Sequence, residues 1–186
     1  QLQQQIGITF LFVTHDQEEA LTLSDRIAVM SEGAVMEIAS PGQLYESPGS
    51  PFVADFIGSM NFFEGEVLSS TDNAMTVETG ALGTVSVTNS DAQMVSGQKA
   101  WVAIRPEKMQ PVFSDPGDLA NTAGGTMGPS AYLGDRSHFY VHLPQREDPV
   151  LVALQNLERS MTQLHKPNQP VWLQWASDAV VVLPRD

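Results

Sequence analysis

The sequence predicts a mostly β protein with a small α/β piece at its N-terminus. In residues 1–58, apolar segments alternate with the residue types that start helices. From residue 59 to residue 186, short alternating segments follow one another between turn residues, with no helical period. Many short strands at this spacing indicate a small barrel or sandwich. We therefore expect two domains, residues 1–58 and residues 59–186.

The N-terminal element is expected to be a buried strand. Ile8 to Val13 is a continuous run of β-branched, aromatic and other apolar residues, and His15 follows it at the start of the next turn. Asp16 is the expected N-cap of a short helix, with Glu19 three residues later as its capping-box partner. Histidine is thereby placed at the carboxyl end of a strand, where reactive groups gather in open α/β sheets.

A hairpin and two short helices are expected next. Apolar segments on both sides of the turn Ser31–Gly33 predict the hairpin. Ser40-Pro41 and Ser50-Pro51 each place a capping hydroxyl before a proline at the first helical position. Gly58 is a suitable residue for the end of the second helix, whose apolar face needs a surface to pack on.

Nine strands are expected in the second part, interrupted by a polar loop over residues 113–120. The predicted strands are Phe63–Leu68, Ala74–Glu78, Thr84–Val87, Ala100–Arg105, Gly125–Leu133, Phe139–Leu143, Val150–Leu154, Val171–Trp175 and Ala179–Leu183.

The composition excludes several classes of protein. No cysteine is present, so a disulfide framework is excluded, and the longest apolar runs are far too short to cross a bilayer. Nine basic residues against 22 acidic ones give a net charge of −13. Because a phosphate backbone would be repelled, nucleic acid is not expected as a partner. The charge is that of a solvated surface, or of an acidic face that attracts a cationic ligand or a basic partner.

Three segments resemble the ATP-binding subunits of ABC importers. The run Phe-Val-Thr-His-Asp-Gln-Glu-Glu-Ala-Leu, Phe12 to Leu21, is similar to their switch-histidine segment. Ser40 to Gly58 resembles the exit from their nucleotide-binding domain. The tail, with Ala103-Ile-Arg-Pro-Glu-Lys108 and Ala131-Tyr-Leu-Gly-Asp135, is similar to their transport-associated OB-like domain, most closely in the polyamine (spermidine/putrescine) importers.

The resemblance implies a truncated ABC ATPase subdomain followed by an OB-like β-barrel regulatory domain. It implies ATP and Mg²⁺ as cofactors of a full-length parent, in which His15 contacts the γ-phosphate and the attacking water. It also implies permease subunits as partners, a homodimer, and a cytoplasmic location on the inner face of the cell membrane. No G-x-x-x-x-G-K-[S/T] loop occurs in the 186 residues. We therefore expect a C-terminal fragment that regulates and dimerises but neither holds a cofactor nor hydrolyses ATP alone.

Several side chains have two interpretations each. Glu107 and Asp135 are candidate ligands of a cation in the regulatory domain. Asp16 and Glu19 can form an acid/base pair, although capping explains both. No metal site is expected from His138 and His142, because four residues along a strand separate them by roughly 13 Å. The aromatic residues Trp101, Trp172, Trp175, Tyr132 and Tyr140 either line a pocket or fill the core.

Two functions of other classes stay open. The first is a free-standing sensor whose OB-like module binds a small ligand. The second is a small hydrolase that uses His15 as its base, although no nucleophile in a G-x-S-x-G or similar setting is present.

Overall fold

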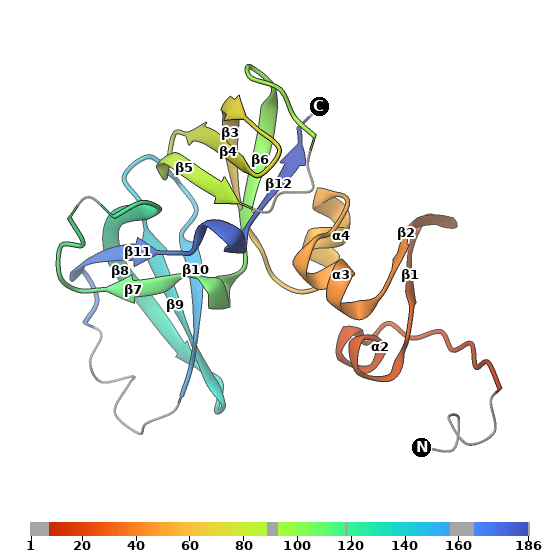
Figure 1. Cartoon of the computed structure of the whole chain (residues 1–186). Helices are drawn as coiled ribbons and strands as arrows, with labels where there is room; N and C mark the ends of the chain where they lie inside the picture. Colours follow the sequence, from red (N-terminus) through yellow and green to blue (C-terminus); the bar gives the residue numbers. More distant parts are fainter. Residues whose placement is uncertain (1–7, 89–92, 118, 157–165, 186) are drawn as a thin grey trace.

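The computed structural model describes residues 8–88, 93–117, 119–156 and 166–185 (Figure 1). Three short helices and a hairpin lie beside a barrel of two five-stranded sheets, so the predicted mostly β fold is confirmed. The helices are α2 (Gln17–Leu23), α3 (Pro41–Glu46) and α4 (Pro51–Phe56), with 3-10 turns η1 (Pro106–Lys108) and η3 (Ser177–Ala179). The strands are β1 (Ile27–Ser31), β2 (Ala34–Ala39), β3 (Asn61–Ser70), β4 (Ala74–Thr79), β5 (Gly83–Thr88), β6 (Lys99–Ile104), β7 (Gln110–Val112), β8 (Thr122–Tyr132), β9 (Arg136–His142), β10 (Val150–Gln155), β11 (Pro170–Gln174) and β12 (Val180–Pro184). In the described residues, no helix combines the length and the hydropathy needed to span a bilayer.

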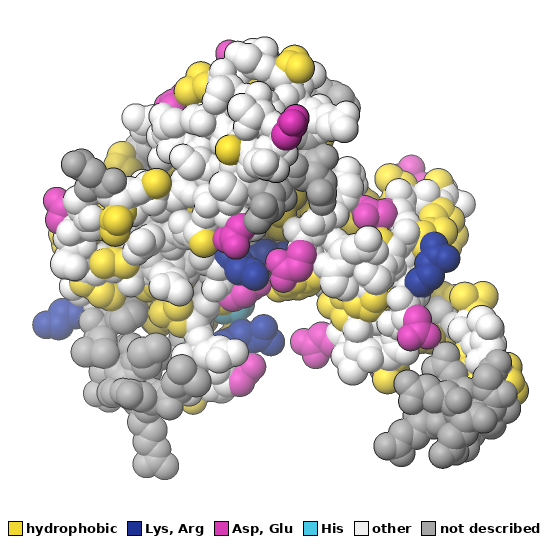
Figure 2. Space-filling model, viewed as in Figure 1, with side chains coloured by type: hydrophobic (Ala, Val, Ile, Leu, Met, Phe, Trp, Pro, Cys, Tyr) yellow, Lys and Arg dark blue, Asp and Glu magenta, His cyan; other side chains and the backbone are white. Residues whose placement is uncertain are grey.

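The predicted first strand is wrong. Ile8 to Val13 has no strand structure, and Leu11 and Val13 are 93% and 96% exposed. An apolar run forms a strand only when a neighbouring strand accepts its backbone hydrogen bonds, and β1 pairs only with β2 in the described sheets. Figure 2 shows further hydrophobic side chains over the β1–β2 hairpin.

At the start of α2, one of the two hydrogen bonds of the predicted capping box is formed. The carboxylate of Asp16 accepts the N–H of Glu19 at 3.1 Å. The Glu19 carboxylate accepts instead from the hydroxyl of Thr14 at 3.1 Å, and that hydroxyl accepts the Asp16 N–H at 3.0 Å. Asp16 thus caps the helix and satisfies a backbone donor at its start, whereas the Glu19 carboxylate binds the Thr14 hydroxyl.

Helices α3 and α4 begin at the predicted caps. Ser40 forms a complete capping box with Gln43, and Ser50 accepts the N–H of Val53. Gly58 follows α4 with φ +98°, a left-handed conformation that glycine adopts without steric cost. The apolar faces of both helices pack with the hairpin in one small cluster of buried residues: Val29, Leu44, Val53 and Ile57.

The barrel consists of two curled antiparallel sheets around one core. The strand orders are β12-β6-β3-β4-β5 and β10-β9-β8-β11-β7. All nine predicted strands of this part are present, with ends that differ by at most three residues. Strand β7 was not predicted. Its three residues include Pro111, which gives no alternating pattern, and it forms only through pairing with β11.

Two buried asparagines connect the sheets. Asn61 on β3 donates to the carbonyl of Leu151 on β10 at 2.8 Å and accepts the Leu151 N–H at 2.9 Å. Asn121 exchanges the same two bonds with Ser86 on β5, both at 2.8 Å. Each side-chain amide takes the place of a strand neighbour, so it satisfies backbone groups where one sheet ends and the other begins.

Replacing Asn61 with leucine should lower the free energy of unfolding by about 2–3 kcal/mol, because both backbone groups of Leu151 lose their partner inside the barrel. Urea denaturation measures this change. The same replacement at the exposed turn residue Asn73 should change stability by less than about 0.5 kcal/mol. Equal effects at both positions would contradict the assigned role of Asn61.

Candidate functional site

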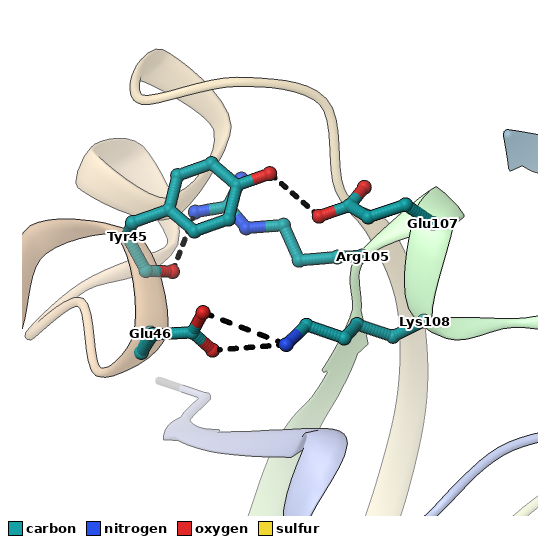
Figure 3. Close-up of polar contacts among 5 residues, drawn as sticks. All are labelled: Tyr45, Glu46, Arg105, Glu107 and Lys108. Atoms are coloured by element: carbon teal, nitrogen blue, oxygen red, sulfur yellow. Dashed lines mark hydrogen bonds and ion pairs between the residues drawn. The ribbon is translucent and has the colours of Figure 1, made fainter. Parts of the chain in front are cut away.

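The contact between the helices and the barrel is built around a buried arginine (Figure 3). Arg105 follows β6 and is only 2% exposed. Its Nη1 donates to the carbonyls of Ala54, Gly58 and Ser59 at 3.1–3.2 Å, and its Nη2 donates to the carbonyl of Tyr45 at 2.9 Å. A planar guanidinium can reach several carbonyls at once, which a lysine ammonium on a flexible stem does less well.

Side chains of α3 and η1 surround this arginine. The Arg105 guanidinium lies 4.0 Å from the centre of the Tyr45 ring, and the Tyr45 hydroxyl donates to Glu107 at 2.5 Å. Lys108 forms an ion pair with Glu46 at 3.4 Å at the exposed edge. We call these five residues the Arg105 junction. Because two elements of the barrel meet α3 and the end of α4 there, the junction fixes the barrel against the helices.

Burial changes the proton affinities inside the junction. Removal from water lowers the pKa of Arg105, while Tyr45 and the nearby carboxylates act in the opposite direction. Burial, reinforced by the hydrogen bond to Glu107 and by its charge, raises the pKa of Tyr45 from 10.0 to about 12. The folded chain therefore binds the phenolic proton more tightly than the unfolded chain does.

Stability should consequently fall as the pH rises from about 10 to about 12. The contribution of Tyr45 is complete below the unfolded pKa and is lost as the pH passes the folded one. Denaturation at several alkaline pH values measures this loss, and Tyr45→Phe should remove the part that Tyr45 causes. Tyr132→Phe is the control, because Tyr132 is 65% exposed and should leave the pH dependence unchanged.

The residues predicted as sites lie in three separate places. His15 is exposed just before the Asp16 cap of α2, outside both hollows described below. Glu107 belongs to the Arg105 junction, whereas Asp135 is exposed between β8 and β9 and lies 3.6 Å from Arg136. The structure therefore does not bring Glu107 and Asp135 to one cavity, and their role as cation ligands stays a prediction. Among the described residues, no three acidic, histidine or cysteine side chains are placed to hold a metal ion.

An open groove of about 790 Å³ lies on the outer face of the sheet that contains β3 and β6. Its lining includes aromatic and charged residues of β3, β6 and the loop between β9 and β10. A smaller hollow of about 400 Å³ against α4 also has Phe62 and Trp101 in its lining, so the two lie side by side. We call the pair the aromatic groove. Trp101 thus lines a surface groove, whereas Trp175 is 4% exposed and fills the core.

The sequence did not reveal the central polar residue of the Arg105 junction. Arg105 occurs within the quoted Ile-Arg-Pro-Glu-Lys segment, but its acceptors are backbone carbonyls 46 to 60 residues away. A charged residue after a strand with five apolar positions, followed at once by proline, is the only local sign of it.

Comparisons with known proteins agree with this architecture. The model of the TOBE domain matches residues 102–183. The spermidine/putrescine import ATP-binding protein PotA of Thermobifida fusca is 35% identical over 183 residues, which are 98% of this chain and 47% of that protein. PotA of Trichodesmium erythraeum is 37% identical over 90% of this chain and 45% of its own. The putrescine transport ATP-binding protein PotG of Escherichia coli is 35% identical over 97% and 48%.

A solved structure shares the fold. The cytoplasmic molybdate-binding protein ModG, with molybdate bound, aligns with a TM-score of 0.55 at 12% identity, over 66% of this chain and 94% of ModG. At this identity the likeness shows the OB-like fold alone. The chain spans a little under half the length of the curated relatives that it matches. With a TOBE domain and with relatives that match nearly its whole length, the chain belongs to the family of ATP-binding subunits of ABC importers.

Proposed function

We propose that this chain is the C-terminal, regulatory part of the ATPase subunit of a polyamine importer. In this proposal, residues 1–58 complete a nucleotide-binding domain, and residues 59–186 form the regulatory domain. The relatives that match most of the chain are named as spermidine/putrescine import proteins, which supports this substrate class. The 186 residues contain no phosphate-binding loop, so the rest of the complete subunit would bind ATP and Mg²⁺.

His15 is the proposed switch residue of the complete subunit. Phosphoryl transfer depends mainly on the position of the reacting groups and on the stabilisation of charge, so one imidazole that holds the attacking water can matter greatly without being a nucleophile. His15 is exposed and lies directly before a capped helix, which leaves it accessible to a nucleotide held by another part of the subunit.

The observation that carries a regulatory role is the Arg105 junction. His15 precedes α2, α2 contacts α3, and α3 supplies Tyr45 and Glu46 to the junction. A movement of the barrel would therefore be passed to the helix that follows the switch histidine. This continuous series of packed elements supports regulation of the ATPase by the barrel.

The partners follow from the same proposal. Two copies of the complete subunit would close on ATP and drive the permease subunits of an importer, which places the protein in the cytoplasm at the inner face of the membrane. The barrel would help to pair the two copies. No nucleic acid is expected, since the net charge of −13 repels phosphate.

The deciding experiment uses the complete subunit that contains this sequence, reconstituted with its permease. His15→Ala should lower ATP turnover about 10²-fold, the size of effect that a positioned acid–base group supplies, while ATP binding remains. His138→Ala is the matched control, because this histidine lies on β9 in the barrel and should change turnover by less than about twofold. Unchanged turnover in His15→Ala, or no ATPase activity in the complete subunit, would contradict the proposal.

A further inference from the structure

His15 lies at the apex of a short turn that is closed by side chains. The hydroxyl of Thr14 accepts the N–H of Asp16 at 3.0 Å, so the residues before and after His15 are bonded to each other. Asp16 has extended backbone angles, and its carboxylate accepts the N–H of Glu19 at 3.1 Å. The backbone of His15 is therefore held on both sides, which limits the directions that its imidazole can take.

The carboxylate of Glu19 sets the direction of the hydrogen bonds in this turn. Because a carboxylate only accepts, the hydroxyl of Thr14 donates its single proton to Glu19, with 3.1 Å between Oγ1 and Oε2. A lone pair of the same hydroxyl oxygen is then left for the N–H of Asp16. The bonds thus form a closed ring from Asp16 to Thr14, from Thr14 to Glu19 and from Glu19 back to Asp16. We call these three residues the turn network.

Helix capping explains only part of the turn network. In a complete capping box, the Glu19 carboxylate would accept the N–H of Asp16 directly, and residue 14 would have no role. The hydroxyl of Thr14 stands between these two groups instead. It thereby ties the residue on the far side of His15 to the helix cap, which a direct bond would not do.

The helix that carries Glu19 is anchored to the small core. Leu21 of α2 packs against the cluster of buried residues from the hairpin, α3 and the end of α4, and α2 contacts α3. One helix therefore has a side chain in the core and another in the turn network. A functional side chain is positioned well when its supporting residues are themselves fixed by packing and by hydrogen bonds.

This arrangement has a chemical consequence for the proposed switch residue. His15 is exposed, and among the described residues its ring has no hydrogen-bond partner. The turn network is therefore the part of the described structure that fixes where the imidazole begins. Phosphoryl transfer depends mainly on position, and a misplacement of about 1 Å can cost about 10²-fold in rate.

We propose that Thr14 and Glu19 are positioning residues for His15, which hold its imidazole toward the nucleotide without touching the nucleotide themselves. This inference rests on the proposed function, because it assigns the residues that orient the switch histidine of the complete subunit. It gives Glu19 two separate roles: its N–H belongs to the helix cap, and its carboxylate belongs to the turn of His15.

ATP turnover of the complete subunit with its permease tests this inference. Thr14→Val keeps the shape of the side chain without the hydroxyl, and should lower kcat about 10-fold while KM for ATP changes less than about twofold. Thr14→Ser keeps the hydroxyl and should restore kcat to within about twofold. Glu19→Ala should act like Thr14→Val, whereas Glu19→Gln keeps an acceptor oxygen and should retain most of the turnover.

Glu18→Ala is the matched control for Glu19→Ala. Both carboxylates belong to the first turn of α2, so their removal changes the charge at the helix start equally. In the described part of the chain, only Glu19 is bonded to the turn network. Glu18→Ala should therefore change kcat by less than about twofold.

Two further readouts separate positioning from general damage. In a His15→Ala background, Thr14→Val should cause no further loss of turnover, because no imidazole is left to position. In the chain of 186 residues, Thr14→Val should speed hydrogen exchange of the Asp16 amide about fivefold, the factor that one net hydrogen bond accounts for, and Thr14→Ser should not.

Four results would overturn the inference. They are turnover of Thr14→Val within twofold of the wild type, equal losses in Glu18→Ala and Glu19→Ala, additive losses of Thr14→Val and His15→Ala, and unchanged exchange of the Asp16 amide in Thr14→Val. Unchanged turnover in His15→Ala would contradict the proposed function and this inference together. A loss in His15→Ala combined with wild-type turnover in Thr14→Val would reject this inference alone.

Discussion

Replacing Arg105 with alanine is expected to weaken the attachment of α3 and α4 to the barrel by about 3–5 kcal/mol. The side chain donates to four backbone carbonyls, and its removal leaves these oxygens without their charged donor in a largely buried region. The stacking contact with the Tyr45 ring is lost as well. Because the barrel has its own core, the loss should appear as local opening of the helices before the barrel unfolds.

Hydrogen exchange of the whole chain distinguishes local from global loss. Protection of amides in α3 and α4 should fall at least about 10²-fold in Arg105→Ala, and barrel amides should change much less. Arg105→Lys should recover only part of the protection, since an ammonium lacks the planar fork. Arg136→Ala removes an exposed arginine of β9 and should have little effect. Uniform loss of protection across the chain would contradict a local role for Arg105.

Replacing Phe63 with alanine should lower the stability of the barrel itself by about 3–5 kcal/mol. Phe63 is 2% exposed in the large core, so truncation removes buried apolar area and leaves a cavity. Arg146 also loses the ring that it covers, although its hydrogen bonds to backbone oxygens remain. Hydrogen-exchange protection should therefore fall first in the barrel, whereas in Arg105→Ala it should fall first in α3 and α4.

Urea denaturation followed by circular dichroism measures the effect of Phe63→Ala. Leu68→Ala is a control on the same strand, because Leu68 is 49% exposed and should cost less than about 1 kcal/mol. Phe63→Leu keeps most of the volume and should fall between the two. A cost at Phe63 no larger than that at Leu68 would show that the ring does not fill the core.

The strands of the barrel were predictable because their pattern is local. In β4, for example, buried and exposed positions alternate along Ala74–Thr79, as the sequence alternation requires. The caps at Ser40 and Ser50 were predictable for the same reason, since each hydroxyl bonds to an N–H three residues later.

Features that depend on distant parts of the chain were not predictable. Ile8 to Val13 has the composition of a buried strand, but composition does not reveal whether a neighbouring strand is available, and in this chain the segment is exposed. The Arg105 junction was missed because backbone carbonyls exist at every position and leave no mark in the sequence. The aromatic groove joins β3, β6 and a loop some 80 residues further on, as the bond between Arg146 and Phe62 shows.

The kind of acceptor at the Arg105 junction bears on whether barrels can be exchanged between importers. Every hydrogen bond that Arg105 donates there ends on a main-chain oxygen, and each amino acid supplies one. Only Gly58, with its left-handed φ of +98°, requires a particular residue type among these positions. A barrel taken from another transporter could therefore be exchanged onto these helices without redesign of their surface, provided that it brings an arginine at the place of Arg105 and partners for Tyr45 and Glu46 at the places of Glu107 and Lys108.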